Sequence, residues 1–177
     1  MNIVVLQGSS NLNGSTAILT EEFARGARSA GHEVVRVDVA RAGVAPCTGC
    51  VACGYEGPCV QHDGMDEVRS EILAADMVVL ATPLYYYGVS AQLKAVVDRF
   101  CSANASITRK RMKSALLAVA WNADDWTFEA LVAHYRTLVR YLDFEDKGMV
   151  LGFGCGTPAM TRRAKAPREA FELGASL

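Results

Sequence analysis

Five short runs of apolar and β-branched residues recur along this chain, and a helical pattern separates each run from the next. An unbroken apolar run of this length is typical of a strand that is buried on both faces of a sheet. Between the runs, apolar residues such as Leu19, Phe23 and Ala27 fall four positions apart, which places them on one helix face. The alternation predicts an α/β fold, a doubly wound five-stranded parallel sheet with helices on both faces. The expected strands cover residues 3–6, 33–39, 77–82, 115–120 and 149–153.

The expected helices divide the chain in the same way. Ser15 or Thr16, Asp63 and Ser90 are residue types that favour the N-terminal cap of a helix. No repeat or linker interrupts the sequence, and 177 residues are enough for one core, so we expect a single domain over residues 1–177. The expected helices run from 15 or 16 to 31, over 64–75, from 90 through 100, over 127–142 and from 167 to 177.

The composition argues against several classes of protein. The chain is 51% hydrophobic, which excludes a disordered protein, and its net charge of −1 gives no general attraction to nucleic acid or to an anionic membrane. Residues 1–7 lack the basic start of a signal peptide, and no apolar run reaches the length of a membrane span. We therefore expect a cytoplasmic protein with reduced cysteines and with no nucleic-acid or membrane partner.

Residues 8–16, here called the first loop, connect the first expected strand to the first expected helix. At such a junction, the free N–H groups of a helix N-terminus suit an anion. The loop lacks both the Gly-x-Gly-x-x-Gly pattern of dinucleotide sites and the lysine of a Walker loop. Its uncharged donors fit a terminal phosphate monoester such as that of FMN, and an ordinary capped turn is the alternative. The donors are the side chains of Ser9, Ser10, Asn11, Asn13, Ser15 and Thr16.

Residues 82–88, here called the tyrosine loop, leave the third expected strand. Three consecutive tyrosines in a loop, Tyr85, Tyr86 and Tyr87, cannot all be buried. Aromatic rings cover planar ligands well, so the loop is predicted to flank an isoalloxazine ring. The alternative is that Tyr85 and Tyr87 only cover the next helix.

Four of the six cysteines lie within residues 47–59, here called the cysteine segment. Their Cys-x2-Cys-x2-Cys-x5-Cys spacing lets one loop surround a [4Fe–4S] cluster. Zinc is a second alternative, although zinc sites favour separated pairs, and free thiols are a third. Because the segment follows the second strand, we expect it at the same sheet edge as the first loop. The four candidate metal ligands are Cys47, Cys50, Cys53 and Cys59; Cys101 and Cys155 receive no role.

The order of these motifs resembles the flavodoxin-like NAD(P)H-dependent FMN reductase family. The resemblance is closest over residues 3–100, and the cysteine-bearing branch resembles the iron–sulfur flavoproteins, which have the same cysteine spacing. It is carried by Gly-Ser-x4-Gly-Ser-Thr in the first loop, by Pro46 before the cysteines and Asp63-Gly-Met65 after them, by Thr82-Pro-Leu-Tyr85, and by Ser90-Ala-Gln-Leu-Lys94 through Asp98-Arg99.

The resemblance implies a sheet order of 2-1-3-4-5, bound FMN, and a homodimer or tetramer. It also implies that a hydride passes from NAD(P)H to flavin N5, so that no catalytic side chain is expected. Electrons would then reach a small-molecule or protein acceptor: a quinone, a flavin, a nitro or azo compound, or an Fe–S centre. The alternatives are a non-enzymatic FMN electron-transfer protein, with or without a [4Fe–4S] cluster, and a thiol-based redox sensor.

The resemblance also implies which residues hold FMN, with two departures from the family pattern. Ser10 and Asn11 stand where many relatives have Pro-Arg, so a cationic phosphate contact is absent, and Trp121 makes the loop after the fourth strand bulky. Separately, the basic run at residues 109–113 could attract the 2′-phosphate of NADPH, although such runs are more often solvated. The implied FMN contacts are Ser9, Asn11, Asn13, Gly14, Ser15 and Thr16 for the phosphate, and Pro83, Leu84, Tyr85, Tyr86, Trp121 and Asn122 for the ring.

Overall fold

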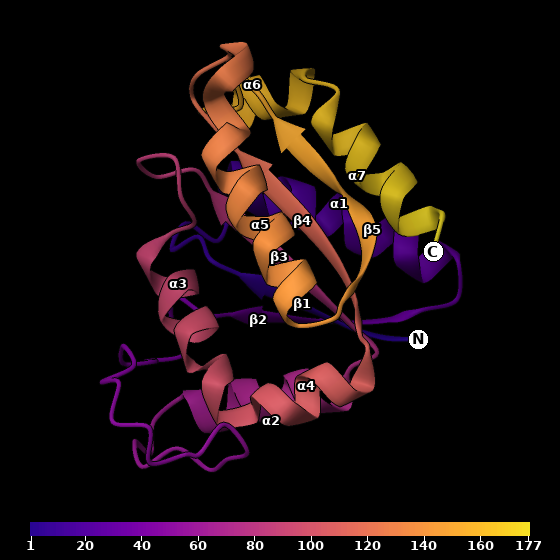
Figure 1. Ribbon diagram of the computed structural model, residues 1–177. Coiled ribbons are helices and arrows are strands. Elements are labelled where there is room, and N and C mark those ends of the chain that lie inside the picture. The colour runs from indigo at the N-terminus through magenta and orange to yellow at the C-terminus, as the bar shows by residue number, and fades with distance from the viewer.

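The computed structural model describes residues 1–177, and its centre is a parallel sheet in the order β2-β1-β3-β4-β5 (Figure 1). This order is the flavodoxin-like one, so the expected fold class is confirmed. Val4 of β1 lies between Val35 of β2 and Val78 of β3, which fixes the register of the three strands. The strands are β1 (Asn2–Gln7), β2 (Glu33–Asp38), β3 (Met77–Pro83), β4 (Lys113–Val119) and β5 (Glu145–Gly152).

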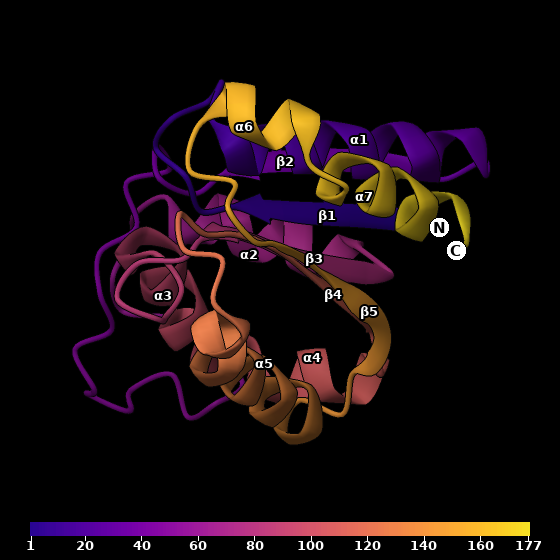
Figure 2. The same ribbon diagram turned by 90° about the horizontal axis from the view of Figure 1, so that it is seen from above.

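Helices cover both faces of the sheet, as Figure 2 shows from above. Because side chains alternate along a strand, Ile3 and Val5 of β1 pack toward one layer and Val4 and Leu6 toward the other. One layer contains α1 (Ser15–Ser29), α6 (Pro158–Arg163) and α7 (Ala166–Ala175). The other contains α2 (Met65–Ala74), α3 (Ala91–Asp98), the 3₁₀ turn η1 (Arg99–Ala103), α4 (Asn104–Lys110), the 3₁₀ turn η2 (Asp125–Phe128) and α5 (Glu129–Tyr141).

The helix starts agree with the sequence in two cases out of three. Ser90 caps α3, since its side chain accepts from the N–H of Leu93 at 3.3 Å. The caps expected at Ser15 or Thr16 are wrong, because Gly14 is the extended N-cap of α1 and no side chain caps that helix. Gly64 directly precedes α2 but has helical backbone angles, and Asp63 Oδ1 accepts from the N–H of Met65 at 2.9 Å, so Asp63 supplies the expected side-chain cap. None of the helices combines the length and the apolar composition that crossing a membrane requires.

The carboxyl ends of β1 and β3 lie side by side at the centre of the sheet. From these ends the chain runs to opposite faces, since β1 continues into α1 and β3 into α3 (Figure 2). In a doubly wound sheet, ligands bind in the crevice at such a switch point. The first loop and the tyrosine loop both leave the sheet here.

Candidate functional site

The first loop is held in shape by its own polar groups. The N–H of Asn11 donates to Ser9 Oγ at 3.2 Å, and the N–H of Asn13 donates to Asn11 Oδ1 at 3.2 Å. The N–H of Gly14 donates to the carbonyl of Asn11 at 3.1 Å. Ser9 and Asn11, both expected to be phosphate donors, therefore use part of their hydrogen-bonding capacity to form the turn.

The start of α1 leaves backbone donors without partners. No side chain caps the helix, and its first turn contains no acidic residue. The first N–H groups of a helix have no acceptor within it, and the helix dipole makes this end attractive to anions. Ser15 and Thr16 add hydroxyl groups at the same place and are largely buried. The arrangement suits a phosphate without a fixed cation.

The first loop is fastened to the beginning of α3. Ser90 Oγ donates to the carbonyl of Gly8 at 2.7 Å, and the N–H of Gly8 donates to the carbonyl of Ala81 at 2.7 Å. A Cβ on Gly8 would lie only 2.8 Å from Leu93 Cβ, so a larger residue would push the two segments apart. These contacts bring the first loop and the tyrosine loop together at one edge of the sheet.

The tyrosine loop contains a tight turn with an unusual sequence. Tyr85 and Gly88 exchange two backbone hydrogen bonds of 3.1 Å, and φ is 45° at Tyr86 and 65° at Tyr87. Positive φ at both central positions is the type I′ turn, which favours Asn-Gly. Two tyrosines in this conformation are strained, and strain of this kind is concentrated at functional sites.

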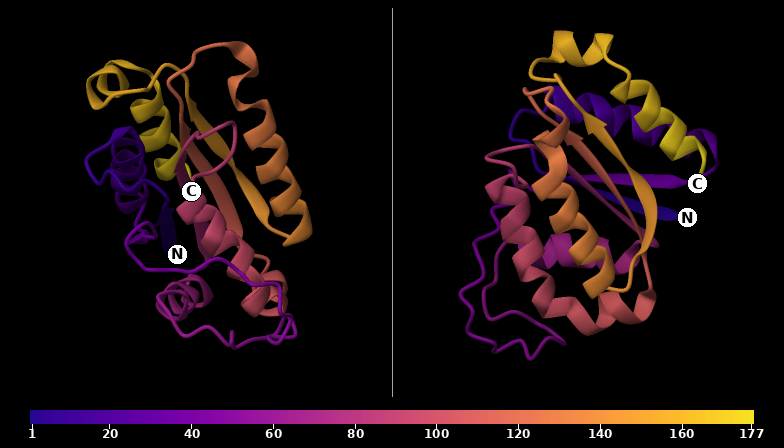
Figure 3. Two further views of the ribbon diagram at one scale, coloured as in Figure 1. Left: turned by 90° about the vertical axis from the view of Figure 1, so that its left-hand side faces the viewer. Right: turned by 45° about the horizontal axis from the view of Figure 1, so that its top comes forward.

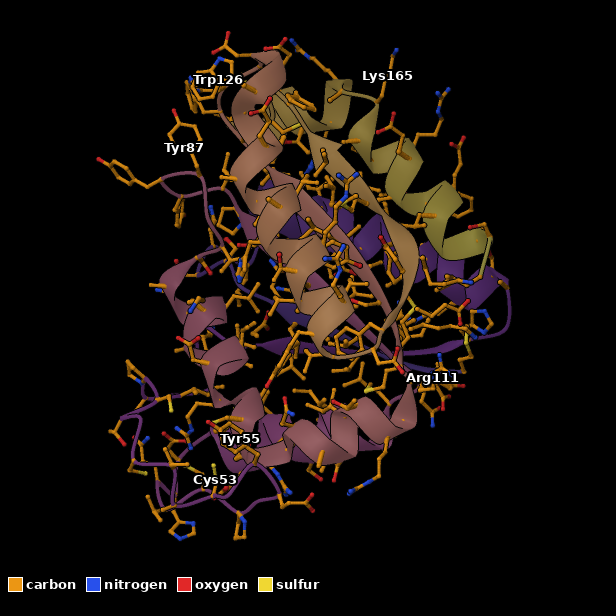
Figure 4. The ribbon with its side chains drawn as sticks, in the orientation of Figure 1. Cys53, Tyr55, Tyr87, Arg111, Trp126 and Lys165 are labelled. Carbon is orange, nitrogen blue, oxygen red and sulfur yellow. The ribbon has the colours of Figure 1, made fainter.

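The turn presents its two central rings differently. Tyr86 is fully exposed. Tyr87 leans toward Trp126, with the ring centroids 5.3 Å apart and the ring planes tilted by 40° (Figure 4). The interpretation that Tyr85 and Tyr87 only cover the next helix therefore does not describe Tyr87, whose aromatic partner precedes α5.

A cavity of about 230 Å³ opens between the tyrosine loop and the segment that follows β4. The N–H of Leu84 donates to the carbonyl of Val119 at 2.7 Å and ties the two segments together. Of the expected ring contacts, Pro83 and Tyr85 do not line the cavity, and the sequence missed Tyr87 and Ala120. The lining residues are Leu84, Tyr86, Tyr87, Ala120, Trp121 and Asn122.

Trp121 fits beside this cavity because its ring lies against Gly156. A Cβ on Gly156 would come within 2.1 Å of Trp121 Cε3, so a side chain at position 156 would displace the indole. Trp121 itself remains 69% exposed. The absence of a side chain at Gly156, in the loop after β5, thus leaves room for the Trp121 indole.

A larger cleft of about 630 Å³ lies on the outer side of the first loop. It is lined by Glu21 and Glu22 as well as by Arg36 and Arg162, and Arg36 pairs with Glu21 at 2.9 Å. The two carboxylates offset the two guanidinium groups in the lining, so this cleft has no net charge to attract a phosphate. The uncapped start of α1 is therefore the better phosphate site.

The basic run at residues 109–113 lies away from this edge. Lys113 begins β4 and is thus at the amino end of the sheet. Lys110 Nζ donates to the carbonyls of Leu73 and Ala75, and Arg111 pairs with Asp143 at 3.0 Å. These contacts give Lys110 and Arg111 a structural role and do not support the interpretation of the run as a site for the 2′-phosphate of NADPH.

The cysteine segment is anchored by Arg99, whose side chain is fully buried. Its Nη1 donates to the carbonyl of Ala45 at 3.0 Å and to Asp63 Oδ2 at 2.9 Å, and its Nη2 donates to the carbonyl of Gln61 at 3.0 Å. Burial disfavours the charge of Arg99, but the Asp63 carboxylate offsets this and raises the pKa of the guanidinium. One arginine thus fixes the chain on both sides of residues 47–59.

All four cysteines of the segment line one cavity of about 130 Å³, and Cys101 of η1 lines it as well. Cys101 Sγ lies 4.0 Å from Cys47 Sγ and 4.0 Å from Cys53 Sγ. Burial and the two neighbouring sulfurs raise the pKa of Cys101 to about 12. No sequence pattern indicates a role for this residue, because 48 or more positions separate it from either partner.

The cysteine segment follows the carboxyl end of β2, as expected, but it does not lie beside the tyrosine loop. Figures 3 and 4 place the cysteine segment beyond the far end of α3, where Cys53 and Tyr55 lie, whereas Tyr87 lies beyond its beginning. The eight residues of α3 rise by about 12 Å at 1.5 Å each. The two candidate sites of one chain are therefore separated by at least the length of this helix.

The family comparison matches most of the chain. Residues 1–146 fit the profile of a family described as NADPH-dependent FMN reductase. Over 99 residues the chain is 35% identical to an iron-sulfur flavoprotein of Archaeoglobus fulgidus, a match that covers 56% of this chain and 45% of that protein. Over 87 residues it is 38% identical to an FMN-dependent NADH:quinone oxidoreductase of Methylorubrum extorquens, covering 45% and 43%. The chain spans about half the length of the curated relatives it matches.

A solved structure has a similar fold over its whole length. An FMN-dependent NADH-azoreductase from Bacillus anthracis, determined in complex with FMN, superposes with a TM-score of 0.74 and covers 99% of both chains. The two sequences are 13% identical, so the similarity shows a common fold.

Proposed function

Since the chain belongs to the NADPH-dependent FMN reductase family, we propose that it binds FMN at the carboxyl edge of its sheet and transfers electrons from NAD(P)H to an acceptor. One juxtaposition supports this most: an uncapped helix start and an aromatic-lined cavity lie at the same sheet edge. They match the two ends of FMN, an anionic phosphate and a planar ring.

In this proposal, the first loop holds the phosphate through uncharged donors. The amides at the start of α1 and the hydroxyls of Ser15 and Thr16 face the anion, and Asn13 adds a side-chain amide. Ser9, Asn11 and Gly14 keep the loop in the required shape through the hydrogen bonds of the turn. Since no cation takes part, phosphate affinity depends on the helix dipole and on hydrogen bonds.

The ring of FMN would occupy the cavity beside the tyrosine turn. When bound, FMN would supply the redox chemistry of hydride and electron transfer. Tyr86, Tyr87 and Trp121 would cover the ring and exclude water from it. Pro83 and Tyr85 would act indirectly, by ending β3 and by closing the turn. Because Tyr86 and Trp121 are exposed, a flat second substrate could stack on them.

We further propose that the acceptor is a planar quinone or azo compound. The names of the Methylorubrum and Bacillus proteins state these two activities for those proteins. A cavity edged by exposed Tyr86 and Trp121 offers flat apolar surfaces that such compounds match. We also propose that the chain forms a homodimer or tetramer and acts in the cytoplasm.

The cysteine cavity fits a [4Fe–4S] cluster held by Cys47, Cys50, Cys53 and Cys59. All four side chains line the same cavity, so the donor set is entirely sulfur. The name of the Archaeoglobus relative gives further support.

Two measurements on anaerobically purified protein test these proposals. Flavin absorption bands, together with NAD(P)H consumption in the presence of a soluble quinone above the rate of free FMN, are the expected result. Protein that stays colourless after incubation with FMN would overturn the flavin site. Bound FMN with no consumption above background would favour the alternative, a non-enzymatic electron carrier.

The cluster is tested separately by iron and sulfide analysis after anaerobic reconstitution. Cys53→Ser should lose most of the bound iron, and Cys155→Ser should keep it, because Cys155 is buried in the other layer of the core. Equal iron in both variants would contradict the assignment of Cys53 as a ligand.

A further inference from the structure

Cys101 gives the cysteine cavity a fifth sulfur, one more than a cluster needs. Its Sγ touches the sulfurs of Cys47 and Cys53, each at 4.0 Å, and comes from a different part of the chain. We propose that Cys101 is a redox-active thiol, which forms a disulfide with Cys47 or Cys53 when the cavity holds no metal. The proposal depends on neither the FMN site nor the presence of a cluster.

The geometry supports a disulfide between the segment and η1. A disulfide joins sulfurs about 2.05 Å apart, so one sulfur must move by about 2 Å. Cys101 is held in place, because Phe100 and Ser102 on either side of it are buried. Cys47 is exposed and Cys53 half-buried, and both belong to a segment without helix or strand. Movement of Cys47 or Cys53 is therefore expected to close the gap while η1 stays fixed.

The surrounding contacts keep the partners close. The N–H of Ala105 donates to the carbonyl of Tyr55 at 3.2 Å, which ties the segment to α4. A Cβ on Gly57 would lie 2.8 Å from the carbonyl of Ser102, so the segment rests directly on η1. Arg99 holds the flanking residues 45 and 61. The thiols thus stay in contact without a metal to gather them.

An azo compound can oxidise the two thiols to a disulfide in a reaction in which atoms and electrons balance. The exposed thiol adds across the N=N bond, so that its sulfur bonds to one nitrogen and its proton goes to the other. Cys101 sulfur then displaces that nitrogen, forming the S–S bond and giving its proton to the leaving nitrogen. Two thiols lose two electrons and two protons, and the azo group becomes a hydrazine.

The disulfide and the proposed cluster would exclude one another. Cys47 and Cys53 are both proposed ligands, so either sulfur can bond to iron or to Cys101 but not to both. Loading the cavity with iron and sulfide should therefore protect Cys101 from oxidation. This consequence rests on the cluster proposal, whereas the disulfide itself is tested on metal-free protein.

The experiment uses the full chain, stripped of metal with a chelator under reducing conditions and then treated with diamide. Unreacted thiols are alkylated, and the protein is cut by trypsin without reduction. Cleavage after Arg41, Arg69, Arg99 and Arg109 leaves the four segment cysteines on one peptide and Cys101 alone on another. We expect these two peptides to appear joined, with two hydrogens missing, and Cys101 to escape alkylation.

Four variants make the result specific. Cys101→Ser should abolish the joined pair, and Cys155→Ser should keep it; comparison of Cys47→Ser with Cys53→Ser identifies the partner. Full alkylation of Cys101 in treated wild-type protein would overturn the proposal. So would a joined pair found only in covalent dimers on a non-reducing gel.

Discussion

The guanidinium of Arg99 contacts oxygens on both sides of the cysteine segment, and it does so through three hydrogen bonds. Two further hydrogen bonds join the same flanks, from the N–H of Ala45 to Asp63 Oδ2 and from Gln61 Nε2 to the carbonyl of Pro46. A lysine carries one ammonium group and cannot reach three separated acceptors at once. We predict that Arg99→Lys lowers the free energy of unfolding by about 3 kcal/mol, the range found when a buried ion pair is broken. Urea unfolding measures this change, and limited proteolysis should show faster cleavage within residues 47–59.

Arg109→Lys is the matched control, since Arg109 is exposed and its ion pair with Glu56 is long, at 3.6 Å. Its effect should stay below about 0.5 kcal/mol. If both variants unfold at the same urea concentration as the wild type, Arg99 does not anchor the segment.

Asp63 gives the Arg99 ion pair its pH dependence. Burial opposes ionisation of Asp63, but the hydrogen bond from Arg99 and those from the amides of Ala45 and Met65 more than offset this, so the pKa is lowered. The folded pKa is then below the unfolded value of about 3.9. The stabilisation is therefore complete above about pH 4 and is lost as pH falls through the folded pKa.

We accordingly predict that wild-type protein loses stability as pH falls below about 4, and that Asp63→Asn shows a shallower loss over the same range. Unfolding midpoints measured from neutral pH downward provide the test. If the unfolding midpoints of the two proteins fall equally steeply below about pH 4, other carboxyl groups control the loss of stability.

The tyrosine turn carries strain that a better turn sequence would remove. The double substitution Tyr86→Asn with Tyr87→Gly supplies the residues that a type I′ turn favours. We predict a gain of about 1 to 2 kcal/mol in unfolding free energy, after subtracting the lost packing of Tyr87 on Trp126. We also predict weaker FMN binding, measured by quenching of flavin fluorescence. Unchanged FMN affinity would mean that neither tyrosine contacts the ring.

At the scale of elements, α1 and α7 pack as closely as two helices can. They lie side by side in Figures 1 and 2. A Cβ on Gly174 would lie 2.2 Å from the carbonyl oxygen of Phe23, and one on Gly26 would lie 2.1 Å from that of Phe171. Glycine in the middle of a helix normally lowers helix stability by about 1 kcal/mol relative to alanine. Glycine is needed at positions 26 and 174 because a larger residue would prevent the close approach of the two helices.

We therefore predict that Gly174→Ala destabilises the protein by about 2 kcal/mol although it improves helix propensity, because overpacking outweighs that gain. Urea unfolding measures the change. Glu172→Ala, at an exposed position of the same helix, should differ from wild type by less than about 0.5 kcal/mol. A more stable Gly174→Ala protein would show that the helices can separate at little cost.

The elements that the sequence predicted are those with a strong apolar pattern. All five strands were expected, but β5 starts at Glu145 rather than at residue 149, because an edge strand can begin with the polar residues Glu145, Asp146 and Lys147. The short helices α4 and α6, of seven and six residues, were missed. Neither is long enough to show a helical period.

At the scale of the whole molecule, sequence motifs indicated candidate sites formed by neighbouring residues and missed the contributions of distant ones. The first loop and the cysteine segment are continuous, so their spacing alone indicated their chemistry. Cys101 and Tyr87 gain their positions only when η1 meets the segment and when the turn adopts positive φ. The separation of the two sites by α3 is likewise a property of the folded chain.

The whole molecule should also report which end of FMN the first loop recognises. A ligand that binds only the folded state at 100 times its Kd stabilises that state by about 2.7 kcal/mol. For a chain of 177 residues, this corresponds to a rise in Tm of about 5 to 10 °C. Riboflavin has the same ring but no phosphate, so at equal concentration it should raise Tm much less. Differential scanning fluorimetry of flavin-free protein measures both shifts, and equal shifts would mean that the start of α1 does not bind the phosphate.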